Sequence, residues 1–412
     1  MTITTSSGQP ITDQQITAYF AHHPATDDIA RDAAALGLDA TAIAYAVSLG
    51  WGQPVSADAV RDWVASSGTY TWDASGMLDA LFTVSPPLSG SLDTSSRPGH
   101  AYVDLHSGAG TASITGLASG STIESDAAGA GTLSLQLANA SGNNDALTLK
   151  LDAAASANFG TVNAGGVETL AIDSTTTNPN PTSVTNTVVL SATAQTTLAI
   201  SGDAALDLST AAQVALLSVK NVDAQAFDAG LDVYLYGNTN DLSIHVGDGN
   251  NIVVAGFGND TISTGAGNDI IFSGRASDVV DAGAGNDWIR GGPAADVMTG
   301  GPGVDTFAYV FAYESSQATG VDTITDFTGG AGGDILDFTA LTHGSGSFAG
   351  SYANLGAATA ALAHGTVHAV VDASTNTLWV DLDANGALDA TNDIAIHLTG
   401  IGYSLTAANF LF

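Results

Sequence analysis

The 412-residue sequence contains no cysteine, and only 7 lysine and arginine residues stand against 41 aspartates and glutamates. Without cysteine, neither a disulfide framework nor a thiolate metal site is available. The formal net charge of −34 argues against nucleic acid and anionic membrane surfaces as direct partners. Glutamate is also nearly absent, so the acidity is almost wholly aspartate, a residue suited to tight loops of oxygen ligands. Cations are therefore the expected partners.

Several sequence signals for export and catalysis are also missing. Residues 1–15 contain neither a basic region nor an apolar stretch, so we predict no secretory signal peptide, and no apolar run is long enough to predict a membrane span. No histidine is followed by glutamate as in H-E-x-x-H, and neither G-x-S-x-G nor a phosphate-binding loop occurs. We therefore expect a protein that is not an enzyme and that, if exported, uses another route.

A nine-residue repeat runs without insertion or deletion from Val246 to Ala308. Its seven frames are VGDGNNIVV, AGFGNDTIS, TGAGNDIIF, SGRASDVVD, AGAGNDWIR, GGPAADVMT and GGPGVDTFA. The sixth position holds Asn251, Asp260, Asp269, Asp278, Asp287, Asp296 and Asp305. The eighth holds Val253, Ile262, Ile271, Val280, Ile289, Met298 and Phe307. A glycine-rich disordered linker would not keep an apolar residue at every ninth position.

The repeat predicts a calcium-binding parallel β-roll, with one turn and one short strand in each frame. Glycines at positions two and four allow positive φ and bring backbone carbonyls close to an ion. The predicted loop ligands include Gly256, Gly258, Gly265, Gly267, Gly283 and Gly285. Because two frames close one coil, Asp260, Asp278 and Asp296 should form one column and Asp269, Asp287 and Asp305 another. Calcium is expected between successive loops of each column.

Some frames depart from this pattern. Position four is Ala276 in one frame and Ala294 in another, and Asn251 replaces aspartate in the first frame. We predict weaker calcium sites at those loops. The apolar column can be followed upstream in the same phase through Leu235 and Ile244, where most loop glycines are lost, so the roll is expected to continue there without calcium.

The chain as a whole is predicted to be mainly β, a calcium-binding β-roll or β-solenoid with a small N-terminal helical domain. The expected domains are a helical domain over 1–84, a linker over 85–100, a β-rich solenoid-like domain over 101–235, the roll over 236–308, and a C-terminal β domain over 309–412. For residues 101–235 an irregular β-helix is favoured, although a sandwich also fits the short alternating strands.

Two further aspartate groups follow the roll. Asp326, Asp334 and Asp337 flank a glycine turn and are placed for one more calcium ion. Asp381, Asp383, Asn385 and Asp389 follow EF-hand spacing around Gly386, but position twelve is Asn392 where a bidentate glutamate is expected. A loop rich in Asx turns is the alternative there.

Residues 235–412 resemble the RTX family secreted by type I systems. The resemblance rests on the frames, the segment DTITDF from Asp322 and the apolar C-terminal residues LTAANFLF. It implies a protein whose partner is the type I secretion machinery, whose export signal lies uncleaved in the C-terminal region, and which folds outside the cell on binding several calcium ions. Extracellular calcium sites have dissociation constants of about 10⁻⁴ to 10⁻³ M, so low calcium inside the cell would keep the chain unfolded.

Residues 101–235 are similar in composition, and in phrases such as GGVETLAIDSTTT, to the β-region of bacterial S-layer proteins. We therefore expect a secreted, extracellular or cell-surface structural protein that assembles with its own copies into a lattice or filament. Its helical domain would provide an anchor to a cell-surface glycan or lipopolysaccharide. The alternative is a calcium-stabilised adhesin or glycan-binding protein, which clustered exposed aromatic residues on a β-face would favour; an enzyme of unrecognised type comes third.

Overall fold

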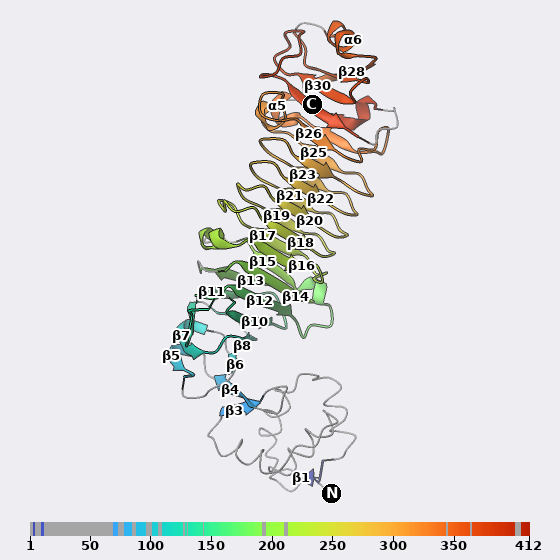
Figure 1. Ribbon diagram of the computed structural model, residues 1–412. Coiled ribbons are helices and arrows are strands. Elements are labelled where there is room, and N and C mark those ends of the chain that lie inside the picture. The colour runs from blue at the N-terminus through green and yellow to red at the C-terminus, as the bar shows by residue number, and fades with distance from the viewer. Residues whose placement is uncertain are drawn as a thin grey trace.

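The structure is a computed structural model of the chain. It describes residues 3–4, 10–11, 69–72, 78–84, 88–95, 101–105, 109–126, 128–129, 131–142, 144–191, 195–209, 213–342, 345–362, 365–399 and 405–412. From β4 onward the chain coils between two parallel β-sheets and forms a long solenoid (Figure 1). The predicted fold class, mainly β with a parallel roll, is confirmed.

Each coil contributes one strand to each sheet. In sheet 1, parallel pairing runs in chain order through β4 (Leu78–Val84), β6 (Ala101–Leu105), β8 (Ser121–Ser125), β10 (Ala146–Asp152), β12 (Thr169–Thr175), β14 (Thr197–Gly202), β16 (Asn221–Ala224), β18 (Ser243–Val246), β20 (Thr261–Ser263), β22 (Val279–Asp281), β24 (Val297–Thr299) and β26 (Asp322–Ile324).

Sheet 2 has 13 strands and faces sheet 1 across the core. Its strands are β5 (Leu88–Asp93), β7 (Ala109–Leu117), β9 (Thr132–Leu137), β11 (Ala157–Gly165), β13 (Thr185–Leu190), β15 (Ala205–Leu208), β17 (Leu231–Tyr234), β19 (Ile252–Val254), β21 (Ile270–Phe272), β23 (Trp288–Arg290), β25 (Thr306–Ala308), β27 (Ile335–Asp337) and β32 (Phe410–Leu411). Residues 101–235 are thus a continuation of the solenoid and not a sandwich.

Coil length is constant only where the nonapeptide repeat occurs. Ile262 pairs with Val280 and Ile271 with Ile289, both 18 residues on. Upstream, Val233 pairs with Val253, 20 residues on, because the loop from β17 to β18 is longer than the corresponding loops of the repeat. The apolar column therefore passes through Ile244, as predicted, but through Val233 and not Leu235.

A single apolar core runs between the two sheets. All seven eighth-position side chains are buried, at no more than 1% exposure. They are central residues of three-residue strands, whose outer neighbours face away from the core because alternate side chains point to opposite sides of a strand. Burying each such side chain contributes about 1.5 to 3 kcal/mol, which offsets part of the entropy lost by ordering the glycine-rich loops.

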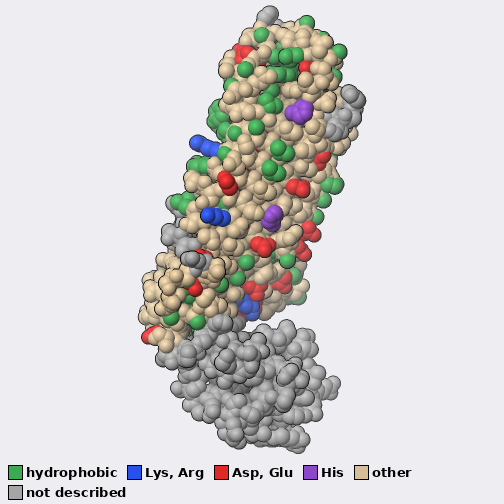
Figure 2. All heavy atoms as spheres, in the orientation of Figure 1, with side chains coloured by type: hydrophobic (Ala, Val, Ile, Leu, Met, Phe, Trp, Pro, Cys, Tyr) green, Lys and Arg blue, Asp and Glu red, His purple; other side chains and the backbone are tan. Residues whose placement is uncertain are grey.

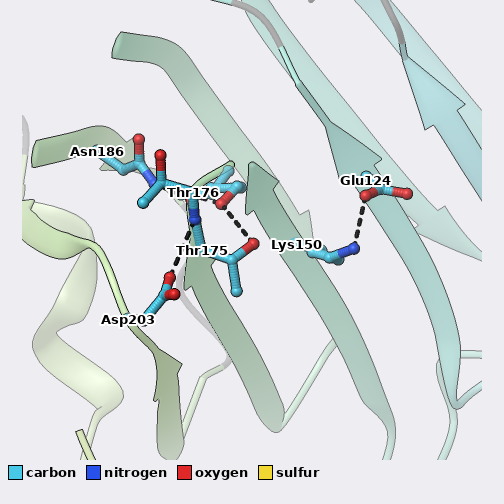
Figure 3. A network of polar contacts seen from close by, with 7 residues as sticks. Glu124, Lys150, Thr175, Thr176, Asn186 and Asp203 are labelled. Atoms are coloured by element: carbon cyan, nitrogen blue, oxygen red, sulfur yellow. Dashed lines mark hydrogen bonds and ion pairs between the residues drawn. The ribbon is translucent and has the colours of Figure 1, made fainter. Parts of the chain in front are cut away.

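The upstream coils are joined by hydrogen-bonding side chains. Lys150 on β10 pairs with Glu124 on β8, with 2.7 Å between Nζ and Oε1 (Figure 3). In the same region the Thr176 backbone N–H donates to Asp203 Oδ1 at 3.0 Å, and the buried Asn186 Nδ2 donates to the Thr175 carbonyl at 3.1 Å. These contacts satisfy turn groups in coils that lack the glycine and aspartate repeat.

The predicted N-terminal domains need correction at their C-terminal side. Residues 69–84, predicted to end a helical domain, contain the strands β3 (Thr69–Trp72) and β4, which pair antiparallel. The predicted linker over 85–100 contains β5, which pairs in parallel with β7. The prolines around this strand suggested a linker, but Leu92 packs against the core. β1 (Ile3–Thr4) and β2 (Pro10–Ile11) also pair antiparallel, and the helices predicted between residues 12 and 64 lie outside the described residues.

A C-terminal cap covers the end of the core that follows β27. It consists of α5 (Thr339–Thr342), β28 (Ser347–Tyr352), α6 (Leu355–Ala360), β29 (His368–Asp372), β30 (Thr377–Asp381) and β31 (Ile394–Leu398). β31 pairs with β26 and so joins the cap to sheet 1. Phe410 and Phe412 near the C-terminus pack into this cap, where Phe410 stacks on Phe348 with ring centroids 4.7 Å apart, whereas Leu411 is exposed.

The remaining short helices are of the 3-10 type. They are η1 (Pro181–Ser183), η2 (Gln213–Ser218), η3 (Ala312–Glu314) and η4 (Ala407–Asn409). Over the ranges that the structure describes, no helix has the length and apolar character needed to span a membrane.

The orientation of β21 gives a direct test of the fold. Ile271→Ala should destabilise the protein by about 2 to 5 kcal/mol, because Ile271 is fully buried and the substitution leaves a cavity. Its neighbour Ile270 is 38% exposed, so Ile270→Ala should cost well under half as much. Urea unfolding in calcium measures both variants. Equal losses would contradict the strand orientation.

Candidate calcium-binding sites

The sixth-position aspartates lie in two columns, one at each edge of the roll. We name the loops 255–260, 273–278 and 291–296 the Asp278 edge; here the chain passes from sheet 2 to sheet 1. The loops 246–251, 264–269, 282–287 and 300–305 form the Asp287 edge, where the chain passes back. These are the two columns that the 18-residue coil predicts.

Within each column, one carboxylate oxygen holds the backbone of the preceding coil. On the Asp278 edge, Asp278 Oδ1 accepts the Asp260 N–H at 2.8 Å and Asp296 Oδ1 accepts the Asp278 N–H at 2.9 Å. On the Asp287 edge, Asp287 Oδ1 accepts the Asp269 N–H and Asp305 Oδ1 accepts the Asp287 N–H, at 2.8 and 3.0 Å. The aspartates thereby fix the spacing of consecutive coils.

Asn251 is the first residue of the Asp287 column and has an uncharged amide where the later coils have a carboxylate. Its Oδ1 accepts the Leu231 N–H at 2.9 Å, and its own N–H donates to Asp269 Oδ1 at 2.7 Å. Its Nδ2 group donates to the Gly249 carbonyl at 2.9 Å. The amide thus occupies the place of a carboxylate but turns a donor toward the loop carbonyls, which favours hydrogen bonding over metal ligation at this coil.

The second carboxylate oxygen of most column residues has no hydrogen-bond partner. These buried atoms are Oδ2 of Asp269, Asp278, Asp287, Asp296, Asp305 and Asp322. Asp260 differs, because its Oδ2 accepts the Gly256 N–H at 3.1 Å. A buried anionic oxygen without a partner is costly. Calcium takes six to eight oxygen ligands from carboxylates and backbone carbonyls, so the residues present fit calcium.

The glycines of the Asp287 edge have no room for a side chain. A Cβ atom at Gly267 would lie 2.1 Å from the Gly249 carbonyl oxygen, and one at Gly285 would lie 1.6 Å from that of Gly267. The φ angles of Gly267 and Gly285 are 149° and 152°, and Gly283 also has positive φ. Consecutive loops therefore stack through their backbones and present carbonyl oxygens beside the carboxylates.

The other predicted loop glycines are required by close approach alone. Cβ atoms at Gly256 and Gly258 would lie 2.2 and 2.1 Å from the carbonyl oxygens of Asn238 and Asn240, and one at Gly265 would lie 2.6 Å from Asp248 Oδ1. None of the three glycines has a φ in the left-handed region. At these three positions glycine is therefore needed for close backbone approach, and its freedom to adopt positive φ is not used.

The two alanines at position four both lie on the Asp278 edge and carry backbone strain. Ala276 has a φ of 69° and Ala294 a φ of 109°, where a Cβ atom is disfavoured by about 1 to 2 kcal/mol. The loops keep the shape that glycine allows despite these residues. Weaker calcium binding at these two loops remains a prediction.

Burial raises the pKa of the column carboxyls. Desolvation raises the pKa of Asp278 to about 8 and those of Asp287 and Asp296 to about 7. The same cause raises the pKa of Asp260 and Asp305 to about 6. Neighbouring aspartates of the same column add to the effect at Asp278 and Asp287. Without a cation, these columns resist the ionised state at neutral pH.

Sequence reasoning missed that both columns extend beyond the repeat. Asp322 Oδ1 accepts the Asp296 N–H and Asp334 Oδ1 accepts the Asp305 N–H, both at 3.0 Å. The separations are 26 and 29 residues, so a search for an 18-residue coil does not find them. The available signal was the aspartate directly before an apolar strand, which repeats the local pattern of the frames.

The predicted site of Asp326, Asp334 and Asp337 is not brought together. Asp326 accepts the N–H groups of Gly300 and Gly301 at 3.0 and 2.7 Å. Asp337 accepts the Thr339 N–H at 2.9 Å next to α5. Each carboxylate therefore serves a different turn, and Asp334 belongs to the column.

The loop between β30 and β31 gathers three carboxylates. Oxygens of Asp381, Asp383 and Asp393 lie within 4.8 Å of one another, and no other such group of three occurs among the described residues. Asn385 donates its N–H toward Asp381 and Asp383, both at 3.2 Å. Sequence reasoning missed Asp393, because the EF-hand pattern places its last ligand one residue earlier.

Asp389 has a different role from the one predicted. It accepts the Asn392 N–H at 2.8 Å and the Thr391 N–H at 3.0 Å. These bonds, that of Asn392 first, lower the pKa of Asp389 to about 2. The loop thus combines the predicted Asx turns with a carboxylate cluster, and Asp389 belongs to the turns.

The fold and both columns define a calcium-binding parallel β-roll. The family model of the RTX calcium-binding nonapeptide repeat (4 copies) matches residues 245–280 and 274–307. This chain therefore carries RTX repeats, which bind calcium at multiple sites. A search of curated proteins finds no match to the chain.

Asp287→Asn tests the metal role of the columns. Asparagine keeps an acceptor for the Asp269 N–H but removes the charge, so the calcium concentration at the midpoint of folding should rise about tenfold or more, because ligand charge sets affinity. Asp281→Asn is the matched control, since Asp281 is exposed on β22 of the same roll. Calcium titration followed by circular dichroism measures both, and equal shifts would argue against stacked calcium sites.

The raised pKa values predict an inverted pH dependence without calcium. Asp278 has an ordinary pKa of 3.8 when unfolded and about 8 when folded, so the folded state binds more protons between these values. The metal-free roll should therefore lose stability as pH rises from 5 to 8, by about 1.4 kcal/mol per pH unit for each such carboxyl. In saturating calcium the columns are ionised, and stability should instead fall as pH falls. Urea unfolding in chelator and in calcium distinguishes the two trends.

Proposed function

We propose that this chain is a secreted, calcium-dependent structural protein, without enzymatic activity, whose copies assemble into a surface layer or matrix filament. The observation that carries the proposal is a pair of neighbouring exposed valines on the outer face of sheet 1, which we name the apolar row and which Thr261 and Thr323 flank in register. Val279 and Val297 are paired on β22 and β24 and are 48% and 39% exposed. Neighbouring apolar side chains exposed on a regular parallel sheet offer a surface that another copy can cover.

Calcium provides the control over when this surface forms. The buried column oxygens lack partners, so the roll depends on a cation for its stability. Chains similar to RTX proteins leave the cell unfolded through a type I system, and low calcium inside the cell would permit that route. Extracellular calcium would then fold the chain and expose the row on sheet 1. Self-association would in this way be confined to the outside of the cell.

The N-terminal residues are assigned the attachment role in this proposal. Residues 1–84 would bind a cell-surface glycan or lipopolysaccharide and hold the assembly at the surface. Most of these residues lie outside the described ranges, so this role rests on the sequence prediction. Similarity of residues 101–235 to S-layer proteins in composition supports the assembly role in the same way.

Assembly can be tested with the purified full chain. Electron microscopy after chelation and return to about 1 to 10 mM calcium should show ordered sheets or fibres only in calcium. Val279→Gln together with Val297→Gln should abolish them while calcium-dependent folding is retained. Leu217→Gln is the control, because Leu217 is 44% exposed in the upstream solenoid. Dispersed, folded wild-type chains in calcium would overturn the proposal.

A calcium-stabilised glycan-binding protein is the second candidate function. It is favoured by exposed aromatic side chains on one edge of the roll, where Tyr236, Phe311 and Tyr313 are each at least 45% exposed. The two functions are compatible, because these residues lie in segments that follow strands of sheet 2, whereas the apolar row lies on sheet 1. The chemistry of the aromatic edge allows a more specific inference.

A further inference from the structure

A groove follows the Asp278 edge beside the outer face of sheet 2. Its volume is about 490 Å³, within the range of small-molecule sites. The residues that define it are Tyr236, Phe257, Arg275, Arg290, Phe311 and Tyr313. They come from successive coils, so the groove extends over about four strand spacings, roughly 19 Å.

The groove arises from an asymmetry between the two edges. At frame position three, the Asp278 edge carries the large residues Phe257 and Arg275, whereas the corresponding Asp287 loops carry Ala266 and Ala284. Both edges carry a side-chain ladder at position five. On the Asp287 edge the N–H groups of Asn268, Asn286 and Val304 donate to Oδ1 of Asn250, Asn268 and Asn286, each at 2.8 Å, and on the Asp278 edge those of Asn259 and Ser277 donate to Oδ1 of Asp241 and Asn259 at 2.8 and 3.1 Å. The two edges therefore differ in the side chains at position three, where Phe257 and Arg275 extend from the Asp278 edge.

Positive charge is concentrated in this groove. Arg275 and Arg290 are the only lysine or arginine residues between positions 221 and 412, and both line it. Figure 2 shows how sparse basic side chains (blue) are on this face of the molecule. Arg290 is committed to the buried Glu314, with 3.0 Å between Nε and Oε1. Arg275 is exposed and, among the described residues, forms no ion pair, so its charge is available to a ligand.

The aromatic rings are arranged as platforms along the groove. Phe311 and Tyr313 stack at 5.1 Å between ring centroids, and Tyr236 meets Phe257 edge-on at 5.5 Å. The Arg275 guanidinium lies 4.9 Å from the Phe257 ring centroid, which holds it beside these rings. Tyr236 is 72% exposed, so most of its ring is accessible to a ligand. Flat rings with polar tips can pack against the faces of sugar rings while hydrogen bonding at their edges.

We propose that this groove binds a segment of acidic polysaccharide. Sugar rings would stack on the exposed aromatic side chains, and a uronate carboxylate would pair with the Arg275 guanidinium, whose planar donors match a carboxylate. The net charge of −34 on the whole chain repels an anionic ligand. Salt screens this long-range repulsion, so the attraction between the Arg275 guanidinium and the carboxylate acts once the two groups are close. Calcium assists, because the Asp278 column belongs to the same loops as the groove and its negative charge is offset when calcium binds.

The test uses the full-length chain carrying Val279→Gln and Val297→Gln, the variant expected to fold in about 1 to 10 mM calcium without assembling, and sedimentation confirms that it is dispersed. The probe is a hyaluronan hexasaccharide, which alternates glucuronate with N-acetylglucosamine, and the neutral control ligand is an N-acetylglucosamine hexamer. Calorimetry should show binding of the acidic probe in calcium. Arg275→Gln should weaken it about tenfold or more, as expected for loss of a charged hydrogen bond. Lys220→Gln is the matched control, since Lys220 is exposed in the upstream solenoid.

Three outcomes would overturn the proposal: no binding of the acidic probe, equal binding of the neutral hexamer, or equal weakening by Lys220→Gln. If Arg275→Gln leaves the probe unaffected but abolishes calcium-driven assembly, the groove is a contact between copies and the saccharide assignment is wrong. The variant must retain the wild-type calcium midpoint of folding, and Tyr236→Ser, which leaves the arginine in place, should also weaken binding. Because binding is measured on dispersed chains, its failure is distinct from a failure of assembly.

Discussion

The fold of the roll depends on how most of the column aspartates, with the exceptions of Asp260 and Asp334, use their two carboxylate oxygens. One oxygen accepts a backbone N–H from the preceding coil, and the other is buried without a partner, as in Asp278 and Asp287. The first bond fixes coil spacing, whereas the second oxygen makes that spacing unfavourable until a cation is present. Three-residue strands contribute too few contacts of their own to hold such narrow coils. Calcium and the apolar core therefore stabilise the roll together.

At the two ends of the roll, where the repeat is absent, other contacts hold consecutive coils together. Upstream, neutral and paired side chains such as Asn186, and Lys150 with Glu124, tie coils of unequal length. Downstream, Asp322 and Asp334 continue the columns into the cap, where β31 and β32 extend the two sheets. The calcium-dependent segment is thus held between parts of the solenoid that use ordinary hydrogen bonds and core packing.

The two edges of the roll differ in what they can do. The Asp287 edge keeps glycine at position four, which gives closely stacked loops. The Asp278 edge accepts Ala276 and Ala294 at positive φ and projects Phe257 and Arg275. A strained backbone maintained beside outward aromatic and cationic side chains suits a surface that contacts another molecule. The Asp287 edge therefore has the more regular loops, and the Asp278 edge has the side chains of the proposed binding groove.

The sequence by itself determined the roll, its core and its two aspartate columns, because a strict nine-residue period fixes strand direction and coil length locally. It did not reveal that Asp322 and Asp334 continue the columns, because coils of 26 and 29 residues break the period. Asp393 was missed because the EF-hand pattern ends one residue earlier, and the strand β5 because prolines flank it. Only the tertiary structure separated Asp326 from Asp337 and brought Tyr236 into one groove with Tyr313. Tyr236 and Tyr313 are distant in sequence. Whether such residues become neighbours depends on the number of coils between them and on the edge of the roll at which each loop lies.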